Sequence, residues 1–185
     1  MTPKEKRDRL LKTRPFIRPL EIFDSGNYHK DIAILWTAHK LQPFHGIDEN
    51  LSQERFASEI DRLSRDISFF MAEDVTTAFD SGKGPVGLIS VVGDGWRVEP
   101  HVTFFSWASA RARLKVAVSF LQWIQYKKIG VCVVRCLRED KNLFDHCRDY
   151  GVLFFAGKII GGNEEGDEFL YSIMGKSNSR RKKTS

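Results

Sequence analysis

The long amphipathic segment at residues 108–127 constrains the fold of this chain more than any other part of the sequence. It reads ASARARLKVAVSFLQWIQYK, and Leu114, Val118, Leu121 and Ile124 recur at the spacing of one helix face. Residues 131–136 follow with an apolar run that is typical of a strand buried on both faces. A long helix that leads directly into a buried strand indicates an α/β fold.

Other segments predict the elements around this pair. Apolar residues at three- and four-residue spacing predict further helices at 28–41, 52–66 and 142–150. Short apolar runs between turn residues predict strands at 67–72, 86–92, 96–105, 153–160 and 168–174. Pro15 and Pro19 restrict the segment around them to an edge strand or an extended start. The predicted order is therefore β-α-α-β-β-β-α-β-α-β-β.

Length and charge favour one domain with short ends. The 185 residues are 42% hydrophobic, which is enough for one packed core. The formal net charge is +5, and residues 176–185 carry five basic side chains and no acid, so the rest is balanced. We expect a charged arm at 1–14, one domain at 15–175 and a basic disordered tail. The balance argues against a broad nucleic-acid-binding face and leaves the tail as a candidate nucleic-acid contact.

Cysteine usage and hydropathy favour a protein that stays inside a cell. Cys132, Cys136 and Cys147 form no CxxC pair, which argues against a disulfide framework and against a zinc site. No apolar run approaches the roughly 20 residues that span a bilayer. The charged N-terminus lacks the apolar stretch of a signal peptide. We expect a cytoplasmic protein with no metal site and no membrane partner.

The order of elements resembles that of the GNAT acetyltransferases over about residues 15–175. Two helices follow the first strand, a three-strand meander leads into the long helix, and a strand, a short helix and a hairpin complete the chain. Local similarities are Val86-Gly87 in the third strand, Asn142 at the start of the short helix, and Tyr150-Gly151-Val152 at its end. The resemblance implies a mixed central sheet flanked by helices. The chain also looks like small GNAT-like proteins of tailed bacteriophages, some of which are internal virion proteins.

This resemblance implies an acetyl-CoA site between two splayed strands, here 96–105 and 131–136. The pantetheine arm would add to exposed backbone in the gap, with Phe104 and Phe105 near the thioester. The pyrophosphate would lie at the start of the long helix, where the helix dipole favours an anion. Arg111, Ala112 and Arg113 would cradle it there, and Asn142 would also bind the cofactor. The family's phosphate loop usually contains glycines, whereas residues 107–113 contain none.

The candidate catalytic residues match the family pattern in part. A tyrosine often lies four residues before the glycine that ends the short helix, where its hydroxyl protonates the leaving thiolate. Cys147 has that position here, with core packing as the alternative, and Tyr150 lies nearby on a different helix face. A general base must accept a proton from the attacking amine. Glu99 and His101, two residues apart on one side of a strand, and Glu73 are the candidates.

Two functions follow from the resemblance. The first is an N-acetyltransferase that moves an acetyl group from acetyl-CoA to an amine on a protein or a small molecule. The second is an inactive GNAT-fold phage protein that binds a virion or host protein. In that case the protein would be found in the host cytoplasm or in the virion.

Overall fold

The computed structural model describes residues 1–20, 26–44, 46–74, 84–93, 97–127, 131–136, 141–163 and 166–173. Its helices are α1 (Pro3–Leu10), α2 (Gly26–Leu41), α3 (Gln53–Leu63), α4 (Ala110–Tyr126) and α5 (Lys141–Asp149). Its strands are β1 (Phe16–Pro19), β2 (Ile67–Asp74), β3 (Gly84–Gly93), β4 (Arg97–Phe104), β5 (Val131–Cys136), β6 (Phe154–Asn163) and β7 (Gly166–Ser172). The predicted α/β order is confirmed, with α1 in front of it. The basic tail predicted at 176–185 lies outside the described residues.

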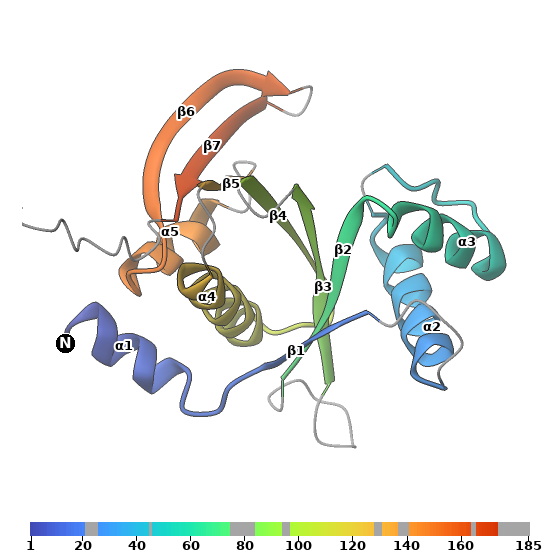
Figure 1. Cartoon of the computed structure of the whole chain (residues 1–185), viewed down its shortest axis with the longest axis horizontal. Coiled ribbons are helices and arrows are strands. Elements are labelled where there is room, and N and C mark those ends of the chain that lie inside the picture. Colours follow the sequence, from blue (N-terminus) through green and yellow to red (C-terminus); the bar gives the residue numbers. More distant parts are fainter. Residues whose placement is uncertain are drawn as a thin grey trace, which may run out of the picture.

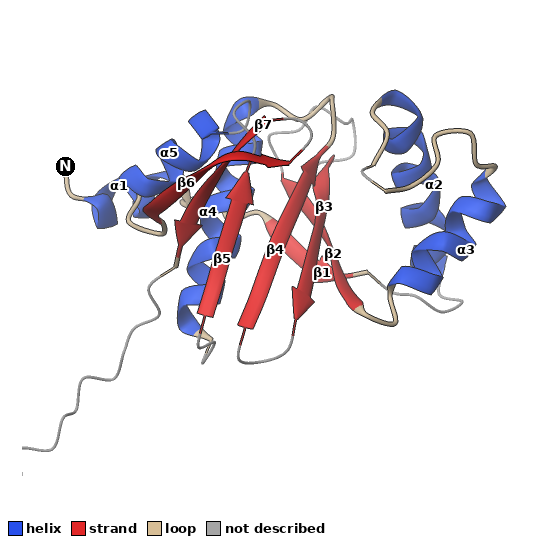
Figure 2. Ribbon diagram, turned by 90° about the horizontal axis from the view of Figure 1, so that it is seen from above, coloured by secondary structure: helices blue, strands red, loops and turns tan. Residues whose placement is uncertain are grey.

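The described strands form one seven-stranded sheet in the order β1-β2-β3-β4-β5-β7-β6. β1 lies at an edge, as the two prolines beside it predict. Strands β1 to β4 pair antiparallel, whereas β4 and β5 are parallel because α4 crosses between them. Their pairing is short, with only Arg97 opposite Val131 and Val98 opposite Cys132. Beyond these residues the two strands diverge toward their carboxyl ends (Figure 2), so the splay expected from the resemblance is present.

Helices cover both faces of the sheet and bury a hydrophobic core on each (Figure 1). The core under α4 and α5, here called the α4 core, includes Val118, Leu121 and Ile124, as the apolar periodicity of α4 predicts. The opposite core lies under α2 and α3 and is called the α2–α3 core. Consecutive residues of β3 enter different cores, with Leu88 in the α2–α3 core and Ile89 in the α4 core.

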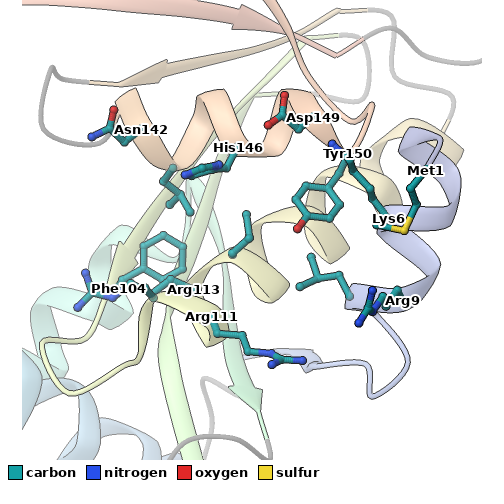
Figure 3. A pocket seen from close by; sticks show the side chains of 14 residues that line it. Met1, Lys6, Arg9, Phe104, Arg111, Arg113, Asn142, His146, Asp149 and Tyr150 are labelled. Carbon is teal, nitrogen blue, oxygen red and sulfur yellow. The ribbon is translucent and has the colours of Figure 1, made fainter.

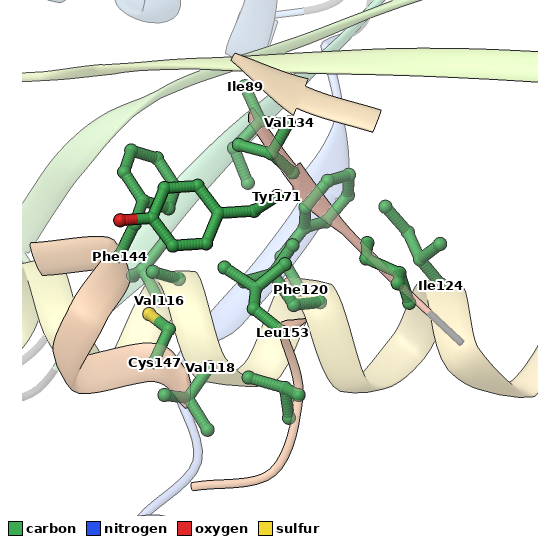
Figure 4. Close-up of a cluster of buried hydrophobic side chains, with 14 of the residues drawn as sticks. Ile89, Val116, Val118, Phe120, Ile124, Val134, Phe144, Cys147, Leu153 and Tyr171 are labelled. Atoms are coloured by element: carbon green, nitrogen blue, oxygen red, sulfur yellow. The ribbon is translucent and has the colours of Figure 1, made fainter. Parts of the chain in front are cut away.

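Cys147 of α5 is a member of the α4 core (Figure 4). Its side chain is fully buried, and this burial raises the pKa of the thiol to about 12. Cys132 of β5 is buried in the same core, and burial, together with the charge of Glu99, raises the pKa of that thiol to about 12. Core packing, the alternative stated for Cys147, therefore describes the placement of both cysteines.

The N-terminal segment, expected as a separate arm, packs against the domain. α1 begins with a capping box in which the Thr2 hydroxyl accepts from the Glu5 N–H, and the Glu5 carboxylate accepts from the Thr2 N–H. Arg7 Nη1 donates to the Tyr150 carbonyl at 2.9 Å, which joins α1 to the end of α5. Leu11 is buried in the α4 core. This burial stabilises the packed position of the segment because it removes apolar surface from water.

A buried ion pair joins three parts of the chain on the α4 side of the sheet. Lys115 Nζ of α4 lies 3.0 and 3.1 Å from the carboxylate oxygens of Asp74, at the end of β2. The same ammonium donates to the hydroxyl of Thr13 at 2.8 Å. Both charged side chains are almost fully buried. In the sequence Lys115 is one of several basic residues in the first turns of α4, and nothing there shows that it turns inward.

Replacement of Lys115 by alanine should strongly destabilise the fold. The change removes the ammonium that compensates a buried carboxylate, a loss that costs about 3–5 kcal/mol. Urea denaturation followed by circular dichroism would measure the free energy of unfolding. Lys12→Ala, an exposed position in the same segment as Thr13, is the matched control and should change it by less than about 0.5 kcal/mol. Equal stability of the two variants would show that the buried pair contributes little.

Cys147 should resist alkylation in the folded protein. Because its pKa is raised to about 12, the thiol stays neutral as the pH rises from about 7 to about 9, and the thiolate is the reactive form. Peptide mapping after iodoacetamide treatment should show Cys147 modified at least about a hundredfold more slowly in native protein than in urea. Equal rates in the two states would contradict its burial.

Candidate functional site

A cavity of about 830 Å³ lies where α1, α4 and α5 meet beside the end of β4. Its walls come from segments far apart in the sequence, since α1 lies beside the carboxyl end of α5 and the first turn of α4 lines the cavity as well (Figure 3). Phe104, the last residue of β4, borders the cavity beyond the point where β4 and β5 cease to pair. The cavity therefore adjoins the gap between the splayed strands.

The start of α4 has the features of an anion site. Ser109 is the N-cap, and its hydroxyl accepts from the N–H of Ala112 at 3.2 Å. The first hydrogen bond inside the helix is the one that the Arg113 N–H donates to the Ser109 carbonyl. The N–H groups of Ala110 and Arg111 come before it and have no partner within the helix. No acidic residue lies in this first turn. Free N–H groups and the positive end of the helix dipole together favour a bound anion.

Arg111 and Arg113 both line the cavity but differ in their partners. Arg113 donates from Nε to the Ala108 carbonyl at 3.0 Å and from Nη2 to the Phe105 carbonyl at 3.1 Å. It therefore orders the loop that leads into α4. Arg111 is exposed, and no ion pair or hydrogen bond of its side chain is found within the described part of the chain. Its charge remains available to a ligand.

The structure does not bring two of the predicted cofactor residues to the cavity. The Ala112 side chain is buried in the α4 core, and Ser109 already occupies its N–H. Phe105 lies in the α2–α3 core with its ring centroid 4.9 Å from that of Trp107. Adjacent strand residues face opposite sides of a sheet, so Phe104 and Phe105 cannot both line one cavity.

One face of α5 lines the cavity while the other packs into the α4 core. Asn142, His146 and Asp149 follow one another at helical spacing on the cavity side, and Cys147 lies on the core side. Tyr150 follows the helix, and its hydroxyl points into the cavity (Figure 3). Of the two residues considered as proton donors, the structure places Tyr150 at the cavity and Cys147 away from it.

The candidate bases lie outside the cavity lining. Glu99 and His101 of β4 are 3.6 Å apart, and His101 is opposite Ser90 in the β3–β4 register. Their side chains share the sheet face of Thr103, whose partner Leu88 belongs to the α2–α3 core. They therefore border the β4–β5 gap from the face opposite to the cavity.

Glu73 belongs to a different cluster. Arg18 of β1 donates to both oxygens of the buried Asp31, at 2.6 and 2.7 Å, and to Glu73 at 3.2 Å. The hydrogen bonds that Arg18 donates to the Asp31 carboxylate raise the pKa of Arg18 more than burial lowers it. This arrangement joins β1, β2 and α2, which is a structural role for Glu73.

His146, Asp149, Lys6 and Arg9 line the cavity but were not singled out from the sequence. His146 could have been predicted, because it lies four residues after Asn142 and so on the same face of the helix. Lys6 and Arg9 were missed because residues 1–14 were assigned to a separate arm.

No group of three His, Cys, Asp or Glu side chains that could hold a metal occurs among the described residues. None of the described helices is long and apolar enough to cross a membrane.

No protein-family model matches the sequence, and no curated protein matches it either. Solved structures do match. A probable acetyltransferase of the GNAT family from Chromobacterium violaceum superposes with a TM-score of 0.62 at 13% identity, over 87% of this chain and 83% of the other. Dodecameric spermidine N-acetyltransferase from Vibrio cholerae gives a TM-score of 0.61 at 12% identity, over 92% and 99%. The chain therefore has the fold of the GNAT acetyltransferases.

Proposed function

We propose that the protein is an N-acetyltransferase that moves an acetyl group from acetyl-CoA to an amine. The observation that carries this proposal is the position of the cavity, which joins a cationic helix start to the gap between β4 and β5. Backbone groups of splayed strands can accept an extended chain as an added strand, which suits a pantetheine arm. The free N–H groups of α4 and the side chain of Arg111 suit its pyrophosphate.

Acetyl-CoA supplies the acetyl thioester. Side chains of this protein would donate one proton and accept another, from opposite faces of the gap in which the thioester lies. The amine nitrogen forms a bond to the carbonyl carbon as the carbon–sulfur bond breaks. Tyr150 would donate its hydroxyl proton to the leaving sulfur from the cavity side. His101 or Glu99, on the opposite face of the gap, would take the proton that the amine loses. The acceptor would therefore approach from the α2–α3 side.

A second candidate is a GNAT-fold protein that acts by binding, such as a phage virion or host-interaction component. The outer strand β6 favours it, because several apolar side chains there are exposed: Phe154, Phe155, Ile159 and Ile160. An exposed apolar edge strand is a common site of association with another chain. This function requires neither acetyl-CoA nor a base.

Binding of acetyl-CoA distinguishes the two candidates. Calorimetric titration of the wild type should give a micromolar Kd, and Arg111→Glu should weaken binding about a hundredfold or more, because it replaces an attractive charge by a repulsive one. Arg55→Glu, on the exposed part of α3 away from the cavity, is the control and should bind like the wild type. No binding by folded wild-type protein at millimolar acetyl-CoA would reject the acetyltransferase and favour the binding protein.

Replacement of Tyr150 by phenylalanine should lower kcat about a hundredfold while the Kd for acetyl-CoA changes little, because a general acid acts in the transition state. Transfer would be measured by chromatography of released CoA. The first acceptors to test are lysine-containing peptides and spermidine, which is the substrate in the name of the similar Vibrio cholerae structure. Tyr126→Phe, at an exposed position outside the cavity lining, is the matched control. An unchanged kcat in Tyr150→Phe would assign the proton transfer to another group.

A further inference from the structure

α1 forms a fixed wall of the cavity beside the end of α5. Besides the bond from Arg7 to the Tyr150 carbonyl, Pro3 packs against Gly151 after α5. Gly151 has φ +68°, and a Cβ there would lie 3.3 Å from the Pro3 side chain. Leu10 packs on the α4 core from the last turn of α1. These contacts hold Lys6 and Arg9 at the cavity.

The cavity lining carries an excess of positive charge. Lys6 and Arg9 come from α1, and Arg111 and Arg113 come from α4, against the single carboxylate of Asp149 among the lining residues. Within the described ranges, neither Lys6 nor Arg9 makes an ion pair or a side-chain hydrogen bond. Figure 3 shows the side chains of Arg9 and Arg111 on the same side of the cavity. An anion bound on that side would therefore meet positive charge from two separate elements.

The order of these groups follows the order of groups along coenzyme A. Phe104 marks the end of the cavity at the β4–β5 gap, Arg111 lies in the middle, and Arg9 and Lys6 lie beyond it on the α1 side (Figure 3). Coenzyme A likewise has a thioester arm, then a pyrophosphate, then a ribose that carries a separate phosphate. The turn before α4 has no glycine to let its backbone close on phosphate, so side-chain cations must supply more of the attraction.

We propose that α1 is part of the cofactor site and that Lys6 and Arg9 bind the ribose phosphate of coenzyme A. This inference rests on the proposed acetyltransferase function and extends its cofactor site to residues 1–14. Arg111 and the first turn of α4 bind the pyrophosphate, and the two cations of α1 select the form of the cofactor that carries the additional phosphate.

The test compares acetyl-CoA with acetyl-dephospho-CoA, which lacks only the ribose phosphate. Calorimetric titration of the wild type should show tighter binding of acetyl-CoA by about tenfold or more. The double variant Lys6→Ala/Arg9→Ala should lose that preference and bind acetyl-dephospho-CoA within about twofold of the wild type. Lys4→Ala/Lys12→Ala removes two charges from the same segment, outside the cavity lining, and should keep the preference.

Several outcomes would overturn the inference while the proposed function stands. These are a wild type that binds both ligands equally, a Lys6→Ala/Arg9→Ala variant that keeps the preference, or one that weakens both ligands alike. A wild type that binds neither ligand overturns both proposals. Circular dichroism would check that the double variant is folded. If it is not, the single change Arg9→Gln at an exposed position provides the same comparison, with a smaller expected loss of preference.

Discussion

The buried contact among Lys115, Asp74 and Thr13 holds together the parts of the molecule on which the cavity depends. Charges at such depth persist only when they are paired, so the positions of α4, β2 and the N-terminal segment are mutually fixed. Lys115 lies one turn after Arg111 on the same helix. Thr13 lies four residues after Arg9 in the chain, beyond the end of α1. The buried ammonium therefore helps to place the N-terminal segment relative to the start of α4.

The rigidity of this arrangement has an electrostatic consequence. Residues 1–175 are balanced in charge as a whole, yet the cavity gathers cations from two segments about a hundred residues apart. Burial of Leu11 and the Arg7–Tyr150 hydrogen bond hold the cations of α1 at the cavity. A site whose cationic side chains are already held in place needs little reorganisation when an anion binds.

Most of the fold could be predicted from the sequence because its signals are local. The period of α4, the apolar run of β5 and the prolines beside β1 each specify an element without tertiary information. The site was predicted less completely. The resemblance pointed to five residues that line the cavity, whereas Ala112 and Phe105, predicted in the same way, face the two cores; the five are Phe104, Arg111, Arg113, Asn142 and Tyr150. Lys6 and Arg9 reach the cavity only through long-range packing, which no local pattern encodes.

The turn before α4 contains no glycine, and this limits how its backbone can bind a phosphate. A glycine-rich loop binds phosphate through backbone N–H groups that approach it closely. Here the Ser109 hydroxyl accepts from one such N–H group, that of Ala112, and the Arg113 side chain donates to the Ala108 carbonyl of the turn. The turn is consequently stiff and offers fewer donors. Cationic side chains can replace the missing donors only if they are held at the right place. The packed N-terminal helix meets that condition, because its own contacts with α5 and the α4 core fix it independently of any ligand.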